Sequence, residues 1–465
     1  MGKRLFQKMF VSLDRTEKLG LPDLQVVTEL DEPDKQETTY HTVCSTYFTK
    51  DKPCCPVCGS NRTTETKIIP RTFKDMLPNT DKNVKIIDLV HHQRYFRCLD
   101  CDKTVVFHEN IDFAEEGCKF TNRLSDVIAE GTLTRSYERV CRDYGVPASK
   151  ASVGIIMRRR MRMRVDMQPP IKAPDSICIF LAGFFSDTFP MVLGIYGRDV
   201  RLLDLLPSSS VMDYRLFFQQ FDCKKVMHVF IDPDEQLHSA VLEIFPQAEI
   251  MVSEEYIRRC AREALKDVIK KEGNHCNIHR RYAKLTAMES HLTSGEHRRV
   301  TAGMKKLPRI RAAYNAYQDV LRRMESGWSI PLLRQWLDSL PDYVSDETGD
   351  GEKIQSLTEF SFLRDVLNLY ERQIQTYLEN ANKPPSGMES AVTGILDALE
   401  RMPYGIYDVL RARMLSDVEQ ELVEIDGKQY RTGVRVEKLT EKMNGIAEAI
   451  RDKKEREEYG YDTEN

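Results

Sequence analysis

Long hydrophobic runs are missing from this chain of 465 residues, and none approaches the roughly 20 apolar residues that a membrane-spanning helix needs. An excess of charge of one sign is also missing, because the formal net charge at pH 7 is only −4. The chain therefore has no global electrostatic attraction to nucleic acid. Any such binding must come from local clusters of basic residues.

A secretory signal peptide is absent as well, although the chain has 12 cysteines. In a reducing cytosol such cysteines serve as metal ligands or core residues rather than as disulfides. We therefore expect a soluble, cytoplasmic protein. The length favours several domains of about 100–150 residues each, because a single ordinary core does not grow to this size.

What the chain does contain is a pair of Cys-x-x-Cys turns, at 55–58 and at 98–101. Four thiolates on two tight turns can close a tetrahedral zinc site, and the spacing is the same in both halves. Two alternatives stay open: two pairs of buried free cysteines, and a site in which the adjacent Cys54 replaces a ligand. The predicted ligands of a structural zinc ion are Cys55, Cys58, Cys98 and Cys101.

A helix-turn-helix pattern follows the cysteine turns. Gly145 and Pro147 break the chain between two helical stretches, and Ser149 is placed to cap the second helix. The start of the second helix in such a unit meets base edges, and a run of arginines after it suits phosphate contacts. A solvated helical face followed by a basic linker is the alternative. The predicted DNA-binding residues are Ser149, Lys150, Ser152, Arg158, Arg159, Arg160, Arg162 and Arg164.

From Ile177 onward the pattern changes to that of β-strands. Three apolar runs are followed by a helix and by a further strand that ends at Asp232. This is the order of elements in a ribonuclease-H-like α/β core. A long block with helical periodicity comes next and contains Trp328 and Trp336, for which a core role is the favoured interpretation.

These patterns predict an α+β multidomain protein. Its expected parts are a polar leader (1–42), a zinc-binding module (43–115), a helix-turn-helix domain with a basic linker (116–170), the first part of the ribonuclease-H-like core (171–256), a large all-α insertion (257–380), core return helices (381–416), and a charged C-terminal extension with a small hairpin and a helix (417–465).

The order of these parts resembles the bacterial insertion-sequence transposases of the ISL3 family, from about residue 50 to 415. The most specific matches are Cys-Pro-Val-Cys-Gly-Ser at 55–60 and Tyr-Phe-Arg-Cys-Leu-Asp-Cys at 95–101. The resemblance implies a bacterial, nucleoid-associated protein that binds duplex DNA at element ends or inverted repeats and self-associates. It also offers a second interpretation of Trp328 and Trp336, which would stack on a flipped base.

The family carries an Asp-Asp-Glu core, whose carboxylates hold two divalent metal ions about 4 Å apart for phosphoryl transfer. The resemblance assigns the second acid to Asp232 and the third to Glu389, and Phe180 occupies the position of the first aspartate. A later family pattern, Asp-Arg-Phe-His, has become the sequence at 253–256. Two separate signatures of the catalytic core are therefore lost.

Substitutes for the missing acid are hard to find near the first strand. Asp175 and Asp187 lie near its ends, but neither has the register of the lost aspartate. The retained acids also have structural interpretations. Asp232 before Pro233 suits a turn, and Glu389 in the first turn of a helix suits the helix dipole.

The sequence therefore predicts a transposase-family DNA-binding protein with impaired DNA cleavage and strand transfer, kept as a regulatory, accessory or decaying copy. Zinc is the expected structural cofactor, and magnesium or manganese is expected only if the core is active. Two alternatives stay open. One is an active metal-dependent transposase that cuts and joins insertion-sequence ends, and the other is a zinc-stabilised interaction protein without specific DNA binding.

Overall fold

The structure is a computed structural model of the chain. It describes residues 19–21, 24–32, 41–48, 51–76, 86–101, 105–145, 149–161, 168–184, 187–220, 222–272, 285–305, 307–344, 356–380, 383, 388–401, 407–416 and 420–458. The chain divides into two compact units rather than into a linear series of domains. Unit 1 comprises Met1–Gln168, Ala398–Val418 and Glu441–Asn465, and unit 2 comprises Pro169–Asp397 and Glu419–Thr440. Every helix within the described residues is too short or too polar to cross a lipid bilayer.

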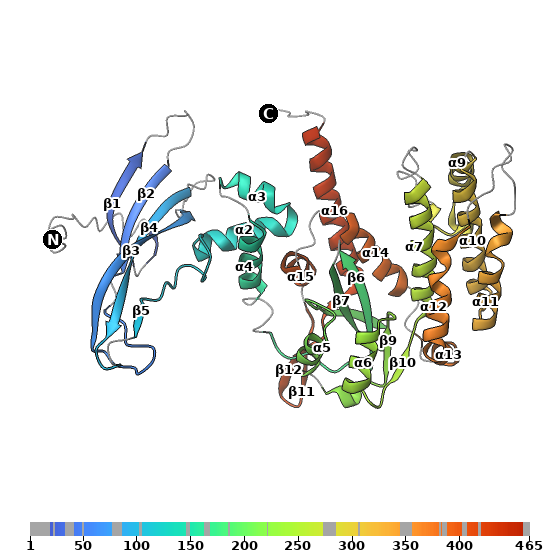
Figure 1. The fold of residues 1–465 in the computed structure, drawn as a ribbon, viewed down its shortest axis with the longest axis horizontal. Helices are drawn as coiled ribbons and strands as arrows, with labels where there is room; N and C mark the ends of the chain where they lie inside the picture. The colour runs from blue at the N-terminus through green and yellow to red at the C-terminus, as the bar shows by residue number, and fades with distance from the viewer. Residues whose placement is uncertain are drawn as a thin grey trace. The chain divides into compact units, whose positions relative to one another are not determined.

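Unit 1 begins with a five-stranded sheet in the order β1-β2-β4-β3, with β5 paired to β4 (Figure 1). Strand β4 buries alternate residues along most of its length, so one face of the sheet packs on a core and the other does not. Phe73 and Leu89 belong to that core, together with Phe113 from the loop that follows. The strands are β1 Leu24–Glu32, β2 His41–Phe48, β3 Thr63–Met76, β4 Ile86–Cys98 and β5 Val106–His108.

The expected polar leader at 1–42 contains strand β1 and the start of β2, so that part of the prediction was wrong. Leu24 and Val26 are both buried in the core of the first sheet. Their spacing of two residues is the signal of a strand with one buried face. The acidic cluster that follows, at Glu29, Asp31, Glu32 and Asp34, gives this stretch the composition of an exposed segment and masks the strand periodicity.

The helical part of unit 1 consists of α2, α3, α4 and α15, in which α2 contacts the other three helices and α15 also contacts α4. Thr121 caps α2 and Ser136 caps α3, because each side chain accepts a hydrogen bond from a backbone N–H in the first turn. The sheet is tied to α2 by a bidentate ion pair between Arg123 and the fully buried Asp75. The helices are α2 Asn122–Thr134, α3 Tyr137–Asp143, α4 Lys150–Met161 and α15 Tyr407–Leu415.

Unit 2 contains a six-stranded sheet in the order β10-β9-β6-β7-β8-β13. Strands β6, β7 and β8 are antiparallel neighbours, whereas β9 and β10 run parallel to β6. Three adjacent antiparallel strands, then a helix and a further strand, were expected from the sequence and are present. The elements are β6 Ser176–Phe184, β7 Asp187–Tyr196, β8 Asp199–Leu205, α5 Val211–Phe218, β9 His228–Ile231, α6 Glu235–Ile244, β10 Glu249–Met251 and β13 Val434–Arg435.

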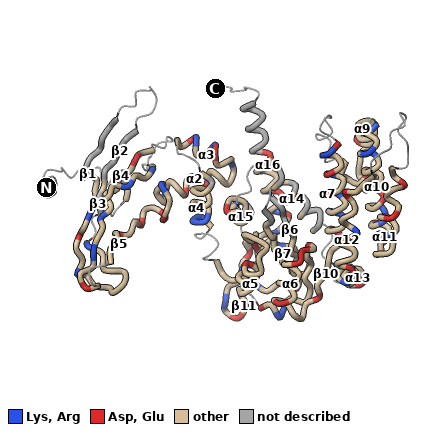
Figure 2. Tube along the Cα trace, in the orientation of Figure 1, with Lys and Arg blue, Asp and Glu red and all other residues tan. Residues whose placement is uncertain are grey.

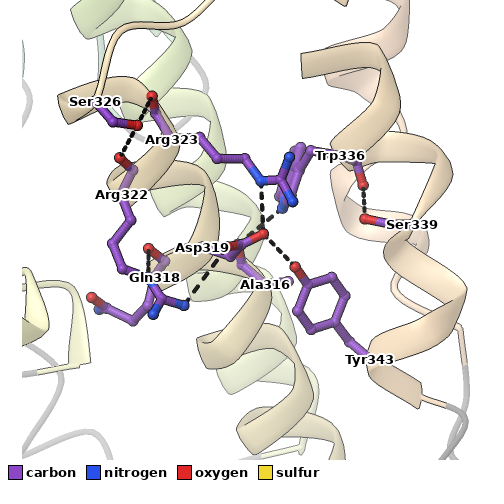
Figure 3. Close-up of polar contacts among 9 residues, drawn as sticks. All are labelled: Ala316, Gln318, Asp319, Arg322, Arg323, Ser326, Trp336, Ser339 and Tyr343. Carbon is purple, nitrogen blue, oxygen red and sulfur yellow. Dashed lines mark hydrogen bonds and ion pairs between the residues drawn. The ribbon is translucent and has the colours of Figure 1, made fainter. Parts of the chain in front are cut away.

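A block of helices follows β10, as the helical periodicity predicted. Both tryptophans are buried there, which supports core roles for them: Trp336 Nε1 donates to the carbonyl oxygen of Ala316 at 3.2 Å, and Trp328 is 8% exposed. In Figure 3, Asp319 accepts hydrogen bonds from Arg323 at 2.9 Å and from Tyr343 at 2.6 Å. The α-helices are α7 Glu254–Glu272, α9 Ser294–Met304, α10 Pro308–Glu325, α11 Ile330–Asp338, α12 Phe362–Leu369 and α13 Glu371–Glu379.

The C-terminal part contains the predicted hairpin and helix. Strands β11 and β12 pair across Asp426 and Gly427, whose φ angles of 51° and 73° suit the turn predicted from the Asp-Gly pair. The segment predicted to be a charged C-terminal extension (417–465) nevertheless adds a strand to the sheet of unit 2, because β13 pairs with β8 at the edge of that sheet. The remaining elements are α14 Met388–Arg401, β11 Leu422–Ile425, β12 Lys428–Arg431 and α16 Val436–Glu458.

Candidate functional site

The two Cys-x-x-Cys turns meet at one end of the β3–β4 hairpin. Cys98 ends β4, where it pairs with Thr63 of β3, and this register carries the second turn to the first. Gly59, with a φ of 71°, lets the chain turn back after the first pair, and its N–H donates to the carbonyl oxygen of Cys55 at 2.9 Å. The four sulfur atoms that lie within 4.8 Å of one another belong to Cys55, Cys58, Cys98 and Cys101.

This four-cysteine centre suits zinc, which prefers four thiolates in a closed tetrahedral site. Cys55 and Cys98 are buried, and the exposed Cys54 is not part of the group. A backbone N–H of Cys58 lowers the pKa of the Cys55 thiol to about 7, whereas the Cys58 thiol raises the pKa of Cys101 above its usual range, so Cys55 loses its proton more readily than Cys101. A zinc ion bound by all four thiolates would leave no position for a reacting water molecule, so its role would be structural.

A second centre lies where β6 and β9 run side by side in unit 2. The Asp232 N–H donates to the carbonyl oxygen of Ile179 at 3.1 Å, and its carboxylate accepts from the N–H of Leu181 at 2.7 Å. The paired register of β6 and β9 ends with Ile179 opposite Ile231, so the next residues of the two segments, Phe180 and Asp232, are neighbours. Both are deeply buried, with exposed fractions of 3% and 2%.

Arg259 of α7 reaches this carboxylate from outside the sheet. Its two terminal nitrogens donate to the two oxygens of Asp232, one of them at 2.9 Å. The same guanidinium lies 5.3 Å from the ring centroid of Phe180 and 5.5 Å from that of Tyr256. Burial lowers the pKa of Arg259, but the adjacent carboxylate outweighs burial and raises this pKa above its usual range.

Glu389 is the second residue of α14, and its side chain is outside what the structure describes. The start of this helix lies against β6, because Met388 Sδ is 3.8 Å from Cys178 Sγ. Within the described residues, no group of three or more Cys, His, Asp or Glu ligand atoms includes Asp232. The side chains described at this position therefore do not fit a pair of magnesium or manganese ions.

Asp175 and Asp187 do not replace the missing acid. Asp175 is exposed and precedes β6. Asp187 pairs with Phe184, which is four residues and hence about 13 Å along the strand from Phe180.

The eroded signature at 253–256 forms the first turn of α7 and the residue before it. Ser253 Oγ accepts a hydrogen bond from the N–H of Tyr256 at 3.3 Å, so this serine caps the helix. Sequence reasoning missed Arg259, which lies three residues after Tyr256 and therefore on the same side of α7. An arginine three residues after Tyr256 was the feature of the sequence that could have predicted a cation on this side of α7.

The predicted DNA-reading segment has a capped second helix. Gly145, with a φ of 58°, ends the first helix, and Ser149 precedes α4. Ser149 Oγ accepts a hydrogen bond from the N–H of Ser152 at 3.1 Å and donates to its hydroxyl at 2.8 Å. Lys150 is the first residue of α4, a position at which such helices meet base edges.

The arginines at the end of α4, which form a blue stretch of the tube in Figure 2, make ion pairs inside unit 1. Arg159 lies 3.1 Å from Glu115 and 3.3 Å from Asp126, and Arg160 pairs with Glu130. The side chain of Arg158 is 60% exposed, against 18% for Arg159 and 13% for Arg160. Arg158 is therefore the most accessible of the three. Arg162 and Arg164 lie outside the described residues.

Comparison with protein families gives a match over residues 188–414 to the ISL3 family of DDE transposases, whose model is described as a transposase. The matched region is shorter than the resemblance in the sequence suggested. It includes Asp232 and Glu389 and begins after Phe180. No protein of curated function matches the chain significantly.

Proposed function

Because this chain belongs to the ISL3 family of transposases, we propose that it binds duplex DNA and that its ability to cut and join strands is impaired. The impairment is inferred from Phe180, which lies in the middle of β6 beside Asp232, the residue that follows the end of the parallel strand β9. Two-metal phosphoryl transfer needs carboxylates that bridge both ions, and a phenyl ring cannot ligate a metal.

A ribonuclease-H-like architecture for unit 2 is part of this proposal. Its support is the strand order β8-β7-β6-β9-β10, with β6–β8 antiparallel and β9 and β10 parallel to β6. In such a core the helices after β10 are an insertion, and α14 returns the chain to the sheet beside β6. Asp232 and Glu389 would then be the inherited second and third acids.

DNA binding is assigned to the helix-turn-helix formed by α3 and α4. Lys150, at the start of α4, would read base edges, and Arg158 would contact a phosphate. The four-cysteine centre would hold structural zinc and so stabilise the sheet next to these helices. Self-association on element ends is the expected mode of assembly, and sedimentation with and without DNA would measure it.

The test uses the full chain and duplex DNA that carries the inverted repeats flanking its own coding segment. A mobility-shift assay should detect binding, and denaturing gels should detect no metal-dependent strand cleavage in magnesium or manganese. Glu389→Gln is the matched variant and should behave like the unmodified chain in both assays. Efficient cleavage that Asp232→Asn abolishes would show instead that the enzyme is active, and loss of all DNA affinity would leave only an interaction role.

A further inference from the structure

We propose that Arg259 is the built-in counter-cation of Asp232, and that its guanidinium takes the place in this core that divalent metal takes in an active centre. The inference rests on the proposed loss of strand cleavage, and it adds that the core needs no divalent ion to neutralise its buried acid. Arg259 acts here as a positioning residue for the carboxylate that joins the end of β9 to the middle of β6.

The first support is the geometry of the pair. Both oxygens of Asp232 accept hydrogen bonds from the two terminal nitrogens of Arg259, which is the bidentate arrangement that guanidinium and carboxylate groups favour. The side chains are 11% and 3% exposed, so water screens the pair little. A metal ion could reach these oxygens only by displacing the guanidinium.

The second support is the remaining hydrogen bond of the carboxylate. Asp232 Oδ2 also accepts from the backbone N–H of Leu181 at 2.7 Å, in addition to its bond from Arg259. The carboxylate is therefore oriented by β6 and neutralised by α7. Desolvating an acid is tolerated when it is paired and hydrogen-bonded in this way.

The third support is the chemistry of the two rings. Phe180 and Tyr256 both lie close to the guanidinium, at 5.3 and 5.5 Å, within the range of cation–π contacts. They occupy the two eroded positions, where the family resemblance expects an aspartate and a histidine. Both replacements thus contact the same cation, which gives the loss of two separate signatures a common physical basis.

Manganese binding to the full, zinc-loaded chain tests the inference directly, with free Mn²⁺ followed by electron paramagnetic resonance. The unmodified chain and Phe180→Asp should show no site at Asp232, because Arg259 still holds the carboxylate. Phe180→Asp combined with Arg259→Gln should bind Mn²⁺ at least ~10-fold more tightly than either. Phe180→Asp alone binding as tightly as the double variant would overturn the inference.

Arg258→Gln is the matched control, because Arg258 is the neighbouring residue and pairs with Glu254 inside α7 at 2.5 Å. Arg258→Gln should leave Mn²⁺ binding unchanged and should leave the ion pair between Asp232 and Arg259 intact. Thermal unfolding provides the second measurement if a variant fails to fold. Asp232→Asn and Arg259→Gln should each lower the Tm by roughly 5–10 °C.

Combining Asp232→Asn with Arg259→Gln should lower the Tm no further than the more damaging single change, because the same interaction is lost in both. Fully additive losses would overturn the inference. Arg259→Lys, which keeps the charge, should recover part of the loss. If the Tm changes at Asp232 and Arg259 are non-additive without added metal but the chain cleaves DNA, only the proposed function is refuted. If the unmodified chain binds Mn²⁺ through Asp232 but does not cleave DNA, only the role of Arg259 is refuted.

Discussion

The guanidinium of Arg413 donates hydrogen bonds to the carbonyl oxygen of Thr132, 281 residues earlier in the chain. A further bond runs from Arg413 to the carbonyl oxygen of Arg135 at 3.1 Å. The last carbonyl groups of α2 lack partners within the helix, and Arg413 supplies donors to them from α15. The arginine is 1% exposed, and burial lowers its pKa to about 10, so it remains charged at neutral pH.

Arg413→Met should therefore destabilise the helical part of unit 1 by about 2–4 kcal/mol, because buried carbonyl groups lose charged donors. Chemical denaturation followed by circular dichroism measures this loss. Arg142→Gln, on the exposed surface of α3, is the control and should change the stability by less than about 0.5 kcal/mol. Equal stability of both variants would mean that α15 does not support α2.

Cys98→Ser should release the metal from the four-cysteine centre and unfold the hairpin end that the centre holds together. Zinc content by mass spectrometry should fall from one ion per chain to none. Cys54→Ser is the matched control, since Cys54 is exposed and outside the group, and it should retain the ion. A purified protein without stoichiometric zinc would contradict the assignment.

Lys150→Ala should reduce the preference for the cognate site, whereas Arg158→Ala should weaken binding to all duplexes alike and reduce the salt slope by about 1. Competition binding at several salt concentrations distinguishes the two effects. Arg159→Ala was expected from the sequence to act like a lost phosphate contact. Its ion pairs with Glu115 and Asp126 predict a loss of stability instead, which thermal unfolding would detect.

Glu359 in the helices of unit 2 should make stability depend on pH. Burial alone would raise its pKa, but Lys271 and Arg309 outweigh burial and lower it below the ordinary value of 4.5. Because the pKa is lower in the folded chain, the stabilisation is complete above about pH 4.5 and is lost as the pH falls through the folded value.

Glu359→Gln should therefore lower the Tm at pH 7 and flatten the acid side of the stability profile. The loss is about 3 kcal/mol, because Arg309 would remain buried without its closest carboxylate. Calorimetry between pH 3 and 7 measures both effects. The exposed Glu371, which pairs with Arg334 at 3.1 Å, provides the control Glu371→Gln with an unchanged profile.

The sequence predicted those elements that depend on residues close together in the chain. The spacing of the cysteines, the three apolar runs after Ile177 and the Asp-Gly turn each depend on neighbouring residues, and each corresponds to an observed element. The pairing of Arg259 with Asp232 was not predicted, because it depends on how α7 packs against the sheet 27 residues later. The same limit applies to Arg413, whose partner lies in another helix of unit 1.

The position of α15 in the same unit as α2–α4 has a consequence for synthesis on the ribosome. About 250 residues separate Met161, which ends α4, from Leu415, which ends α15. At ~5–20 residues per second, the ribosome needs about 13–50 s to make them. During that interval α2 lacks the donors of Arg413, so the nascent helices wait for most of the remaining chain before their bundle is complete.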